Sequence, residues 1–150
     1  RAVALVEGAS EQGYFRALAP RIGLDLDSRS ISVIDVEGEG DFKAHIRYLQ
    51  ALKIPALCFR DKPPSGISDD MKLLFRDHGG KEFEIFMKDQ GFGYLFDEAK
   101  KEVGNSKARQ ARYIGIKKPV EKVPDVHRAF LEAVFQLPKV AEPAEAHKAQ

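Results

Sequence analysis

The sequence is poor in the residues that thiol, zinc and nucleotide chemistry use. Its single cysteine, Cys58, cannot form an internal disulfide, which favours a reducing compartment, and we expect the cytoplasm. The four histidines are scattered, without the spacing of zinc ligands. There is no Gly-x-x-x-x-Gly-Lys phosphate loop and no Gly-x-Ser-x-Gly nucleophile elbow. These absences argue against a zinc site, against ATP binding by a phosphate loop and against hydrolysis by a side-chain nucleophile.

Long apolar runs are also absent. No run approaches the roughly 18 residues of a membrane-spanning helix, and no segment resembles a signal peptide, so we expect no membrane partner. The chain has 150 residues, of which 43% are hydrophobic and 31% charged, as is typical of one soluble globular domain. It starts at Arg1, directly before a strand pattern, and we therefore expect it to be a piece of a larger protein.

Basic residues gather in the second half of the chain. The net charge is only +1, so affinity for nucleic acid would have to come from such a local cluster. Eight lysines and arginines lie between Lys100 and Lys122. The cluster is either the solvated face of a helix or a nucleic-acid contact, and the charge pattern leaves both readings open.

The first 60 residues alternate between strand and helix patterns. Apolar segments at 3–6, 31–36 and 54–59 predict three strands, and helical periodicity after Ser10 and after Asp41 predicts two connecting helices. Strand–helix–strand units build parallel sheets, because their crossovers are right-handed and cover the sheet with helices. We therefore predict an α/β fold, a parallel sheet flanked by helices.

The pattern changes in the second part of the chain. Prolines and a glycine make 62–66 a loop, and 71–75 predicts a short fourth strand. Helical patterns follow, with an interruption at Gly91 and new helices after Ser106 and at Asp125. We expect three parts, namely a core over 1–78, a helical C-terminal portion of the same region over 79–137 and a polar tail over 138–150.

Acidic residues follow each of the first three predicted strands. Glu7, Glu37 and Asp61 come directly after the strands, and Glu11 lies in the first turn of the next helix. The carboxyl ends of parallel strands share one edge of the sheet, where ligands bind, so we expect these acids to converge. Burying acids is costly unless a cation shares the site. Carboxylates with few histidines select a hard cation, Mg²⁺ or Mn²⁺.

Five segments follow one another in a recognisable order. They are Val-Glu-Gly-Ala-Ser-Glu at 6–11, Gly-Leu-Asp-Leu-Asp at 23–27, Ile-Ser-Val-Ile-Asp-Val-Glu-Gly at 31–38, Asp-Phe-Lys at 41–43 and Leu-Lys-Ile-Pro-Ala at 52–56. Together they resemble the Toprim domain of the overcoming-lysogenization-defect (OLD) family of nucleases. The resemblance covers roughly the first 61 residues, and later acidic and lysine-bearing segments at 81–84 and 106–114 look similar.

The resemblance implies a Toprim-like fold and a metal-dependent DNA endonuclease that uses Mg²⁺ or Mn²⁺, with two ions expected. By this resemblance the metal ligands would be Glu7, Glu11, Asp61 and Glu84. The catalytic residues would be Glu7 and Lys107, and the residues in contact with DNA would be Lys107, Arg109 and Arg112. The resemblance also implies an ATPase domain in the same full-length protein, and it is compatible with a homodimer.

The sequence departs from the family at one position. Pro63 stands where the Toprim Asp-x-Asp motif, which begins at Asp61, has its second aspartate. Proline cannot ligate a metal, so three explanations stay open. Asp69 or Asp70 swings in from the following segment, one metal position is weakened, or residues are missing after Lys62.

Three functions therefore remain open at this point. The first is a metal-dependent DNA endonuclease. The second is a catalytically weakened Toprim module that binds nucleic acid or regulates a partner. The third is a receiver-like phosphoacceptor domain, since acids after the first and third strands also suit aspartyl phosphorylation. Purely structural readings exist as well, because Glu11 can serve the helix dipole, Asp61 a turn and Glu84 an exposed helix face.

Overall fold

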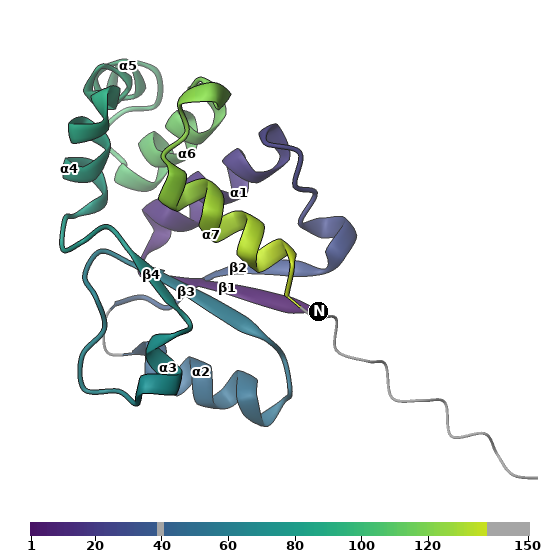
Figure 1. Ribbon diagram of the computed structural model, residues 1–150. Helices are drawn as coiled ribbons and strands as arrows, with labels where there is room; N and C mark the ends of the chain where they lie inside the picture. Colours follow the sequence, from purple (N-terminus) through teal and green to yellow (C-terminus); the bar gives the residue numbers. More distant parts are fainter. Residues whose placement is uncertain (39–40, 138–150) are drawn as a thin grey trace, which may run out of the picture.

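A single parallel sheet forms the centre of the molecule. The computed structural model describes residues 1–38 and 41–137, so the predicted tail over 138–150 lies outside the described residues. The sheet has four parallel strands in the order β2-β1-β3-β4 (Figure 1). The strands are β1 (Ala2–Val6), β2 (Ile31–Asp35), β3 (Ala56–Arg60) and β4 (Phe75–Asp77). The predicted parallel sheet flanked by helices is confirmed.

The two central strands are apolar on both faces. Every residue of β1 and β3 is buried, as expected of parallel strands that helices cover on both sides. The edge strand β2 alternates instead, with Ile31 and Val33 buried and Ser32 exposed. In the register of the sheet, Val6 pairs with Asp35 on one side and with Phe59 on the other. The carboxyl ends of β2, β1 and β3 therefore lie level with one another.

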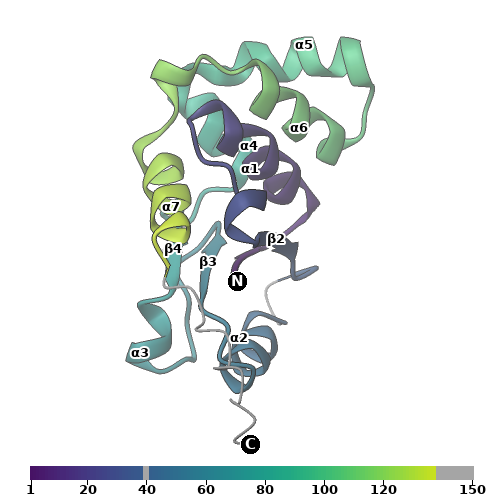
Figure 2. The same cartoon turned by 90° about the vertical axis from the view of Figure 1, so that its right-hand side faces the viewer.

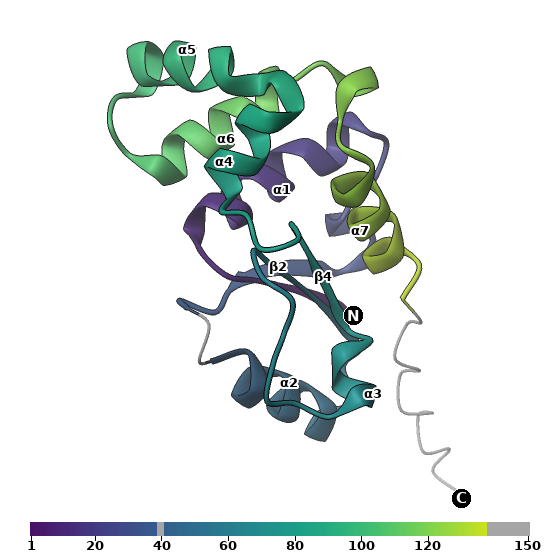
Figure 3. The same cartoon turned by 60° about the vertical axis from the view of Figure 1, so that its left-hand side comes forward.

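Helices cover both faces of the sheet (Figures 1 and 3). On one face lie α2 (Phe42–Ala51) and the short α3 (Asp69–Lys72). On the other face lie α1 (Ala9–Arg21), α4 (Phe83–Met87), α5 (Gly93–Val103), α6 (Lys107–Lys117) and α7 (Asp125–Phe135). The short elements are the 3₁₀ turns η1 (Asp27–Arg29) and η4 (Val120–Lys122) and the π-type segment η3 (Lys88–Phe92). None of the helices in the described part of the chain is long and apolar enough to cross a membrane.

Each face of the sheet has its own hydrophobic core. Alternate residues of β1 enter different cores, with Ala4 and Val6 in one and Leu5 in the other. The larger core joins the sheet to α1, α4, α5, α6 and α7, so the predicted helical portion shares its core with the strands. The boundary between a core over 1–78 and a helical portion over 79–137 stays a prediction. The smaller core lies beneath α2 and α3 and contains the buried Cys58 thiol.

Helices α1 and α6 approach each other closely at Gly115. A methyl group on Gly115 would lie 2.7 Å from the backbone oxygen of Tyr14 and 3.0 Å from the Cβ of Ala17. On α1, Gly13 faces the backbone oxygen of Ala108 in the same manner, at 3.3 Å. Figure 2 shows α6 beside α1 above the sheet. Because both helices use glycine at the crossing, the first turn of α6 is brought close to the first turn of α1.

Two local predictions need correction. The segment 71–75 is not a strand, because Ser68 caps the short helix α3 by accepting a hydrogen bond from the Met71 N–H, and the strand starts only at Phe75. Helix α1 is capped by Gly8, so Ser10 lies inside the helix. The interruption at Gly91 is confirmed, since this residue has a φ of 87° between two helical segments.

Candidate metal centre at the carboxyl edge of the sheet

Glu7 connects the ends of two neighbouring strands. It is the first residue after β1, and its Oε2 accepts a hydrogen bond from the backbone N–H of Asp61, at 2.9 Å. Asp61 is the first residue after β3, which lies next to β1 in the sheet. The level ends of parallel strands make this contact possible. The predicted convergence of Glu7 and Asp61 on one edge is therefore present in the structure.

Glu11 is the most buried acid of this edge. It lies in the first turn of α1 with 6% of its surface exposed. The pKa of the Glu11 carboxyl is raised from 4.5 to about 7, chiefly by burial and to a smaller extent by the negative charges of Asp61, Glu7 and Asp35, while a backbone hydrogen bond lowers it. A cation bound beside Glu11 would favour its charged form.

Gly8 leaves room for the Glu11 carboxylate. A methyl group at Gly8 would lie 3.2 Å from Oε2 of Glu11, which is closer than an ordinary contact. The glycine that follows Glu7 in the sequence thus has a physical reason in the site itself. It keeps the turn between β1 and α1 free of a side chain at the place where the two glutamates meet.

Asp35 is an acid of this edge that the sequence reasoning missed. The sequence predicts Glu37 there, but Glu37 is exposed and has a φ of 60°, while its N–H donates to Oδ1 of Asp35 at 2.7 Å. Asp35 is half-buried at the last position of β2; burial is the main cause that raises the pKa of Glu11, and the charge of Asp35 adds a small contribution. Asp35 was missed because the apolar pattern predicts a strand over 31–36, whereas β2 ends one residue earlier, at Asp35.

A pocket of about 220 Å³ gathers most of the predicted residues. Glu11 and Asp61 line it from the sheet side, and Glu84 and Lys107 line it from α4 and α6. Its other lining residues are Gly8, Ser10, Glu82, Phe83, Phe96 and Gln110. The structure thus brings together residues that are up to 102 positions apart, from Gly8 to Gln110, in one small hollow.

The two residues that line the pocket from above differ in their surroundings. Glu84 forms an ion pair with Lys88, the first residue of η3, at 2.8 Å, so part of its charge is already compensated. Lys107 is the exposed first residue of α6, where the Ser106 hydroxyl caps the helix by accepting from the Arg109 N–H at 3.4 Å. Lys107 forms no ion pair among the described residues, and it lines the same pocket as the acids.

Arg109 and Arg112 lie on a different side of α6. They line a second hollow of about 610 Å³ between α1 and α6, together with Arg16 and Gln12 of α1. None of the predicted acids lines this hollow. The three basic residues predicted to contact nucleic acid are thus divided, with Lys107 at the acidic pocket and the two arginines beside Arg16.

The loop after β3 does not return to the site. Asp69 and Asp70 are exposed on α3, which lies on the opposite face of the sheet from α4 and α6 (Figure 1). Asp69 contacts Lys72 at 3.6 Å, and neither aspartate lines the acidic pocket. Pro63 is exposed. The explanation in which Asp69 or Asp70 replaces the missing aspartate is therefore not supported by this structure.

The donor set of the edge fits a hard divalent cation by its chemistry. The charged groups that act on Glu11 are the carboxylates of Asp61, Glu7 and Asp35, and oxygen is the donor that Mg²⁺ and Mn²⁺ select. Among the described residues, however, no three histidine, cysteine or acidic side chains already stand at the spacing of a complete metal site. The metal-binding role of Glu7, Glu11 and Asp61 therefore stays a prediction, in which further ligands would come from water or substrate.

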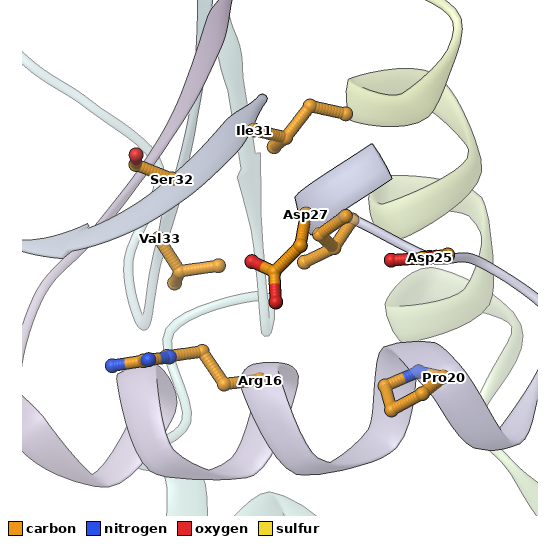
Figure 4. A pocket seen from close by; sticks show the side chains of 8 residues that line it. Arg16, Pro20, Asp25, Asp27, Ile31, Ser32 and Val33 are labelled. Carbon is orange, nitrogen blue, oxygen red and sulfur yellow. The ribbon is translucent and has the colours of Figure 1, made fainter. Parts of the chain in front are cut away.

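A larger pocket of about 430 Å³ lies elsewhere, beside the edge strand β2. Figure 4 shows it between β2 and α1, with the Asp27 carboxylate extending into it above Arg16. It contains none of the predicted site residues and lies against the first half of β2, Ile31–Val33, away from the carboxyl ends of the strands. Size alone therefore does not mark the functional edge of this sheet.

The fold and the acidic edge agree with the resemblance to a Toprim domain. Residues 1–62 match the model of the Toprim domain of proteins like the overcoming lysogenization defect protein. This match confirms the resemblance over these residues. The match favours the Toprim reading over the receiver-like alternative. The comparison with curated proteins gave no match.

Solved structures extend the likeness to nearly the whole chain. The C-terminal region of the Xanthomonas campestris pv. campestris OLD protein superposes with a TM-score of 0.70 at 16% identity, covering 90% of this chain and 92% of that one. The C-terminal region of the Burkholderia pseudomallei OLD protein also gives 0.70, at 17% identity, covering 89% and 96%. At such low identity these structures establish the fold, including its helical C-terminal portion.

Proposed function

We propose that this domain is a metal-dependent DNA endonuclease. The observation that carries the proposal is the pocket in which Glu11 and Asp61 face Lys107, next to the hydrogen bond between Glu7 and Asp61. The family of the first 62 residues supports a nuclease-type domain. A cluster of acids beside a lysine suits phosphodiester hydrolysis, because acids hold divalent cations and a lysine stabilises negative charge.

In this proposal Glu7, Glu11 and Asp61 hold divalent ions, Mg²⁺ or Mn²⁺, with Glu84 as a further ligand for a second ion. When bound, the ions would activate water and stabilise the charge that develops on the scissile phosphate. The residues of the chain prepare this chemistry. The hydrogen bond from Asp61 fixes Oε2 of Glu7, and burial keeps water away from the Glu11 carboxylate.

Lys107 has a separate task at the same pocket. Lys107 lines the pocket from the start of α6, together with Glu11 of α1 and Asp61, which follows β3. From there it would contact a non-bridging phosphate oxygen or the leaving oxygen of the substrate. Such a contact strengthens as negative charge grows, so Lys107 would act chiefly in the transition state.

DNA would continue from the pocket onto the arginines of the neighbouring hollow. Arg109 and Arg112 are exposed on α6 beside Arg16, and no carboxylate lines this hollow. Arginines without acidic partners suit the phosphate backbone, whose contacts carry affinity but no sequence preference. We further propose that the domain works with an ATPase domain of the same full-length protein, and that two copies can associate.

A second candidate is a Toprim module that binds nucleic acid without cutting it. Pro63 supports this candidate, because it stands where the motif has its second aspartate and no other acid of the following segment lines the pocket. The two functions share the fold and the arginines. They differ only in whether the acidic pocket supports chemistry.

The test is nicking of supercoiled plasmid by the full chain with Mg²⁺, Mn²⁺ or a chelator. The nuclease proposal expects relaxed or linear DNA with either metal, none with chelator, and none from Glu7→Ala. DNA binding without nicking at every metal concentration would favour the second candidate. Neither nicking nor binding would reject both.

A further inference from the structure

Four polar side chains form a continuous buried chain behind the acidic pocket. They are Lys118, Tyr14, His127 and His78, with 0%, 0%, 0% and 5% of their surfaces exposed. The Lys118 Nζ lies 3.2 Å from the Tyr14 hydroxyl, which lies 2.8 Å from Nδ1 of His127. The two Nε2 atoms of His127 and His78 are 2.7 Å apart, and Nδ1 of His78 is 3.4 Å from Oδ1 of Asp61. The chain thus ends on a proposed metal ligand.

The buried lysine fixes the direction of the hydrogen bonds. In its ammonium form Lys118 can only donate, so the Tyr14 hydroxyl then accepts from Lys118. Among the described residues, Nδ1 of His127 is the only acceptor near the Tyr14 hydroxyl, which therefore donates to it. His127 then carries its proton on Nε2 and donates to Nε2 of His78. His78 in turn carries its proton on Nδ1 and donates to Asp61.

The surroundings of Lys118 support its role as the fixed end. Its Nζ lies 3.8 Å from the centroid of the Phe92 ring and 3.6 Å from the Sδ of Met87, and it has no carboxylate partner in the described part of the chain. Burial lowers the pKa of Lys118 to about 7, so Lys118 is an ammonium below that pH, and burial holds the pKa of His127 well below its usual value. A neutral His127 is what the chain requires, because its Nδ1 must accept.

Asp61 is held at three points as a result. Its N–H donates to Glu7, its backbone oxygen accepts from the Gly80 N–H at 2.8 Å, and its Oδ1 accepts from His78. With Oδ1 engaged by a donor, the orientation of the carboxylate is set and Oδ2 is left for another partner. Groups that fix a ligand in this way commonly decide how well a metal site binds.

We propose that His78, His127 and Tyr14 are positioning residues, which transmit the donor direction of Lys118 to the Asp61 carboxylate and hold it ready for a divalent cation. The proposal rests on the proposed function in one respect, since it takes Asp61 to be a metal ligand. Tyr14 lies on α1 and His127 on α7, while His78 directly follows β4 and Lys118 directly follows α6. The positioning therefore depends on how these elements pack together.

The first test is the tautomeric state of the two histidines. Long-range proton–nitrogen correlation spectra of the full metal-free protein, recorded below pH 7 where Lys118 is an ammonium, report which ring nitrogen carries the proton. We expect Nε2–H for His127 and Nδ1–H for His78. Tyr14→Phe removes one oxygen but keeps the ring contacts with Phe15 and Phe83, and it should give mixed tautomers at both histidines. A wild-type His78 protonated on Nε2 would overturn the proposal.

The second test is the affinity for Mn²⁺ of the same proteins, measured by calorimetry. We expect Tyr14→Phe to raise the dissociation constant about 10- to 100-fold. Ile46→Val, in the core on the other face of the sheet, controls for a general loss of packing and should leave the constant unchanged. Equal affinities in wild type and Tyr14→Phe would overturn the positioning role. A wild type that binds no Mn²⁺ would reject the proposed metal site. The tautomers would then still report on the direction of the hydrogen bonds from Lys118 to Asp61.

Discussion

The carboxylate of Glu7 accepts a hydrogen bond from the backbone N–H of Asp61 at 2.9 Å, across the ends of β1 and β3. This contact joins residues 54 positions apart and ties the first acid of the chain to the strand that carries the second. It also leaves Oε1 of Glu7 available to another partner. The position of the two acids is therefore determined by the sheet and not by a flexible loop.

Replacing Glu7 by alanine tests that contact. The loss of the hydrogen bond leaves the half-buried Asp61 N–H without its acceptor, and we expect a loss of about 1–3 kcal/mol in the free energy of unfolding. Denaturant unfolding measures this change. Glu37→Ala is the matched control, because Glu37 is exposed after the neighbouring strand and should change stability by about 0.5 kcal/mol or less. Equal effects of the two substitutions would contradict the role of Glu7.

The raised pKa of Glu11 predicts a pH-dependent stability. Because the folded-state pKa is about 7 and the usual value is 4.5, the protonated form is favoured in the folded protein, and stability is lost as pH rises from about 4.5 through 7. Glu11→Gln removes this loss. The free energy of unfolding of Glu11→Gln minus that of the wild type should therefore increase by about 3 kcal/mol as the pH rises across that range. This corresponds to about 1.4 kcal/mol for each pKa unit.

Denaturant unfolding of both proteins at acidic and mildly alkaline pH, without metal, measures this difference. Added Mn²⁺ should stabilise the wild type at the alkaline end and leave Glu11→Gln unaffected. A difference between the two proteins that stays constant with pH would show that Glu11 does not titrate in this range.

The close crossing of α1 and α6 predicts that Gly115 cannot be enlarged. A Cβ at this position would lie 2.7 Å from the backbone oxygen of Tyr14, so Gly115→Ala must separate the helices, and we expect it to cost about 1–3 kcal/mol. Gly93→Ala is the matched control, because Gly93 is helical and its Cβ would only contact the Lys88 side chain at 3.5 Å. We expect the control to be neutral or to stabilise by up to about 1 kcal/mol. Thermal unfolding of the two variants decides the matter.

The arginine hollow predicts a salt-dependent DNA affinity. The double substitution Arg109→Gln and Arg112→Gln should weaken binding to DNA of any sequence, and it should reduce the slope of log affinity against log salt by about 1 for each arginine that binds a phosphate. Fluorescence anisotropy at several salt concentrations measures both quantities. Lys43→Gln on α2, on the other face of the sheet, should change neither. An unchanged slope in the double variant would place DNA elsewhere.

Much of the fold follows from local sequence patterns. The apolar segments of β1 and β3, with a helical period between them, suffice to predict a parallel sheet, because such strands must be covered on both faces. Glu7 and Asp61 could be placed on one edge for the same reason. The error at 71–75 is also local, since the capping residue Ser68 outweighs the apolar character of the segment that follows.

The rest depends on tertiary packing that no local pattern reveals. Asp35 replaces Glu37 at the edge because β2 ends earlier than its apolar residues suggest. Tyr14 and His127 are 113 positions apart, and each by itself is an ordinary residue on a helix. Their contact exists only because α1 and α7 pack on the same face of the sheet. Buried polar chains of this kind have no sequence period, so sequence reasoning could not find them.

The central claim is that the acids at this edge of the sheet cut DNA. Its most direct test compares metal-dependent plasmid nicking by the variants Glu11→Gln and Glu37→Gln. Both glutamates follow neighbouring strands, but Glu11 is buried at the pocket and Glu37 is exposed. We predict that Glu11→Gln loses nicking with both Mg²⁺ and Mn²⁺ while Glu37→Gln cuts as the wild type does. Full nicking by a folded Glu11→Gln variant would contradict the account.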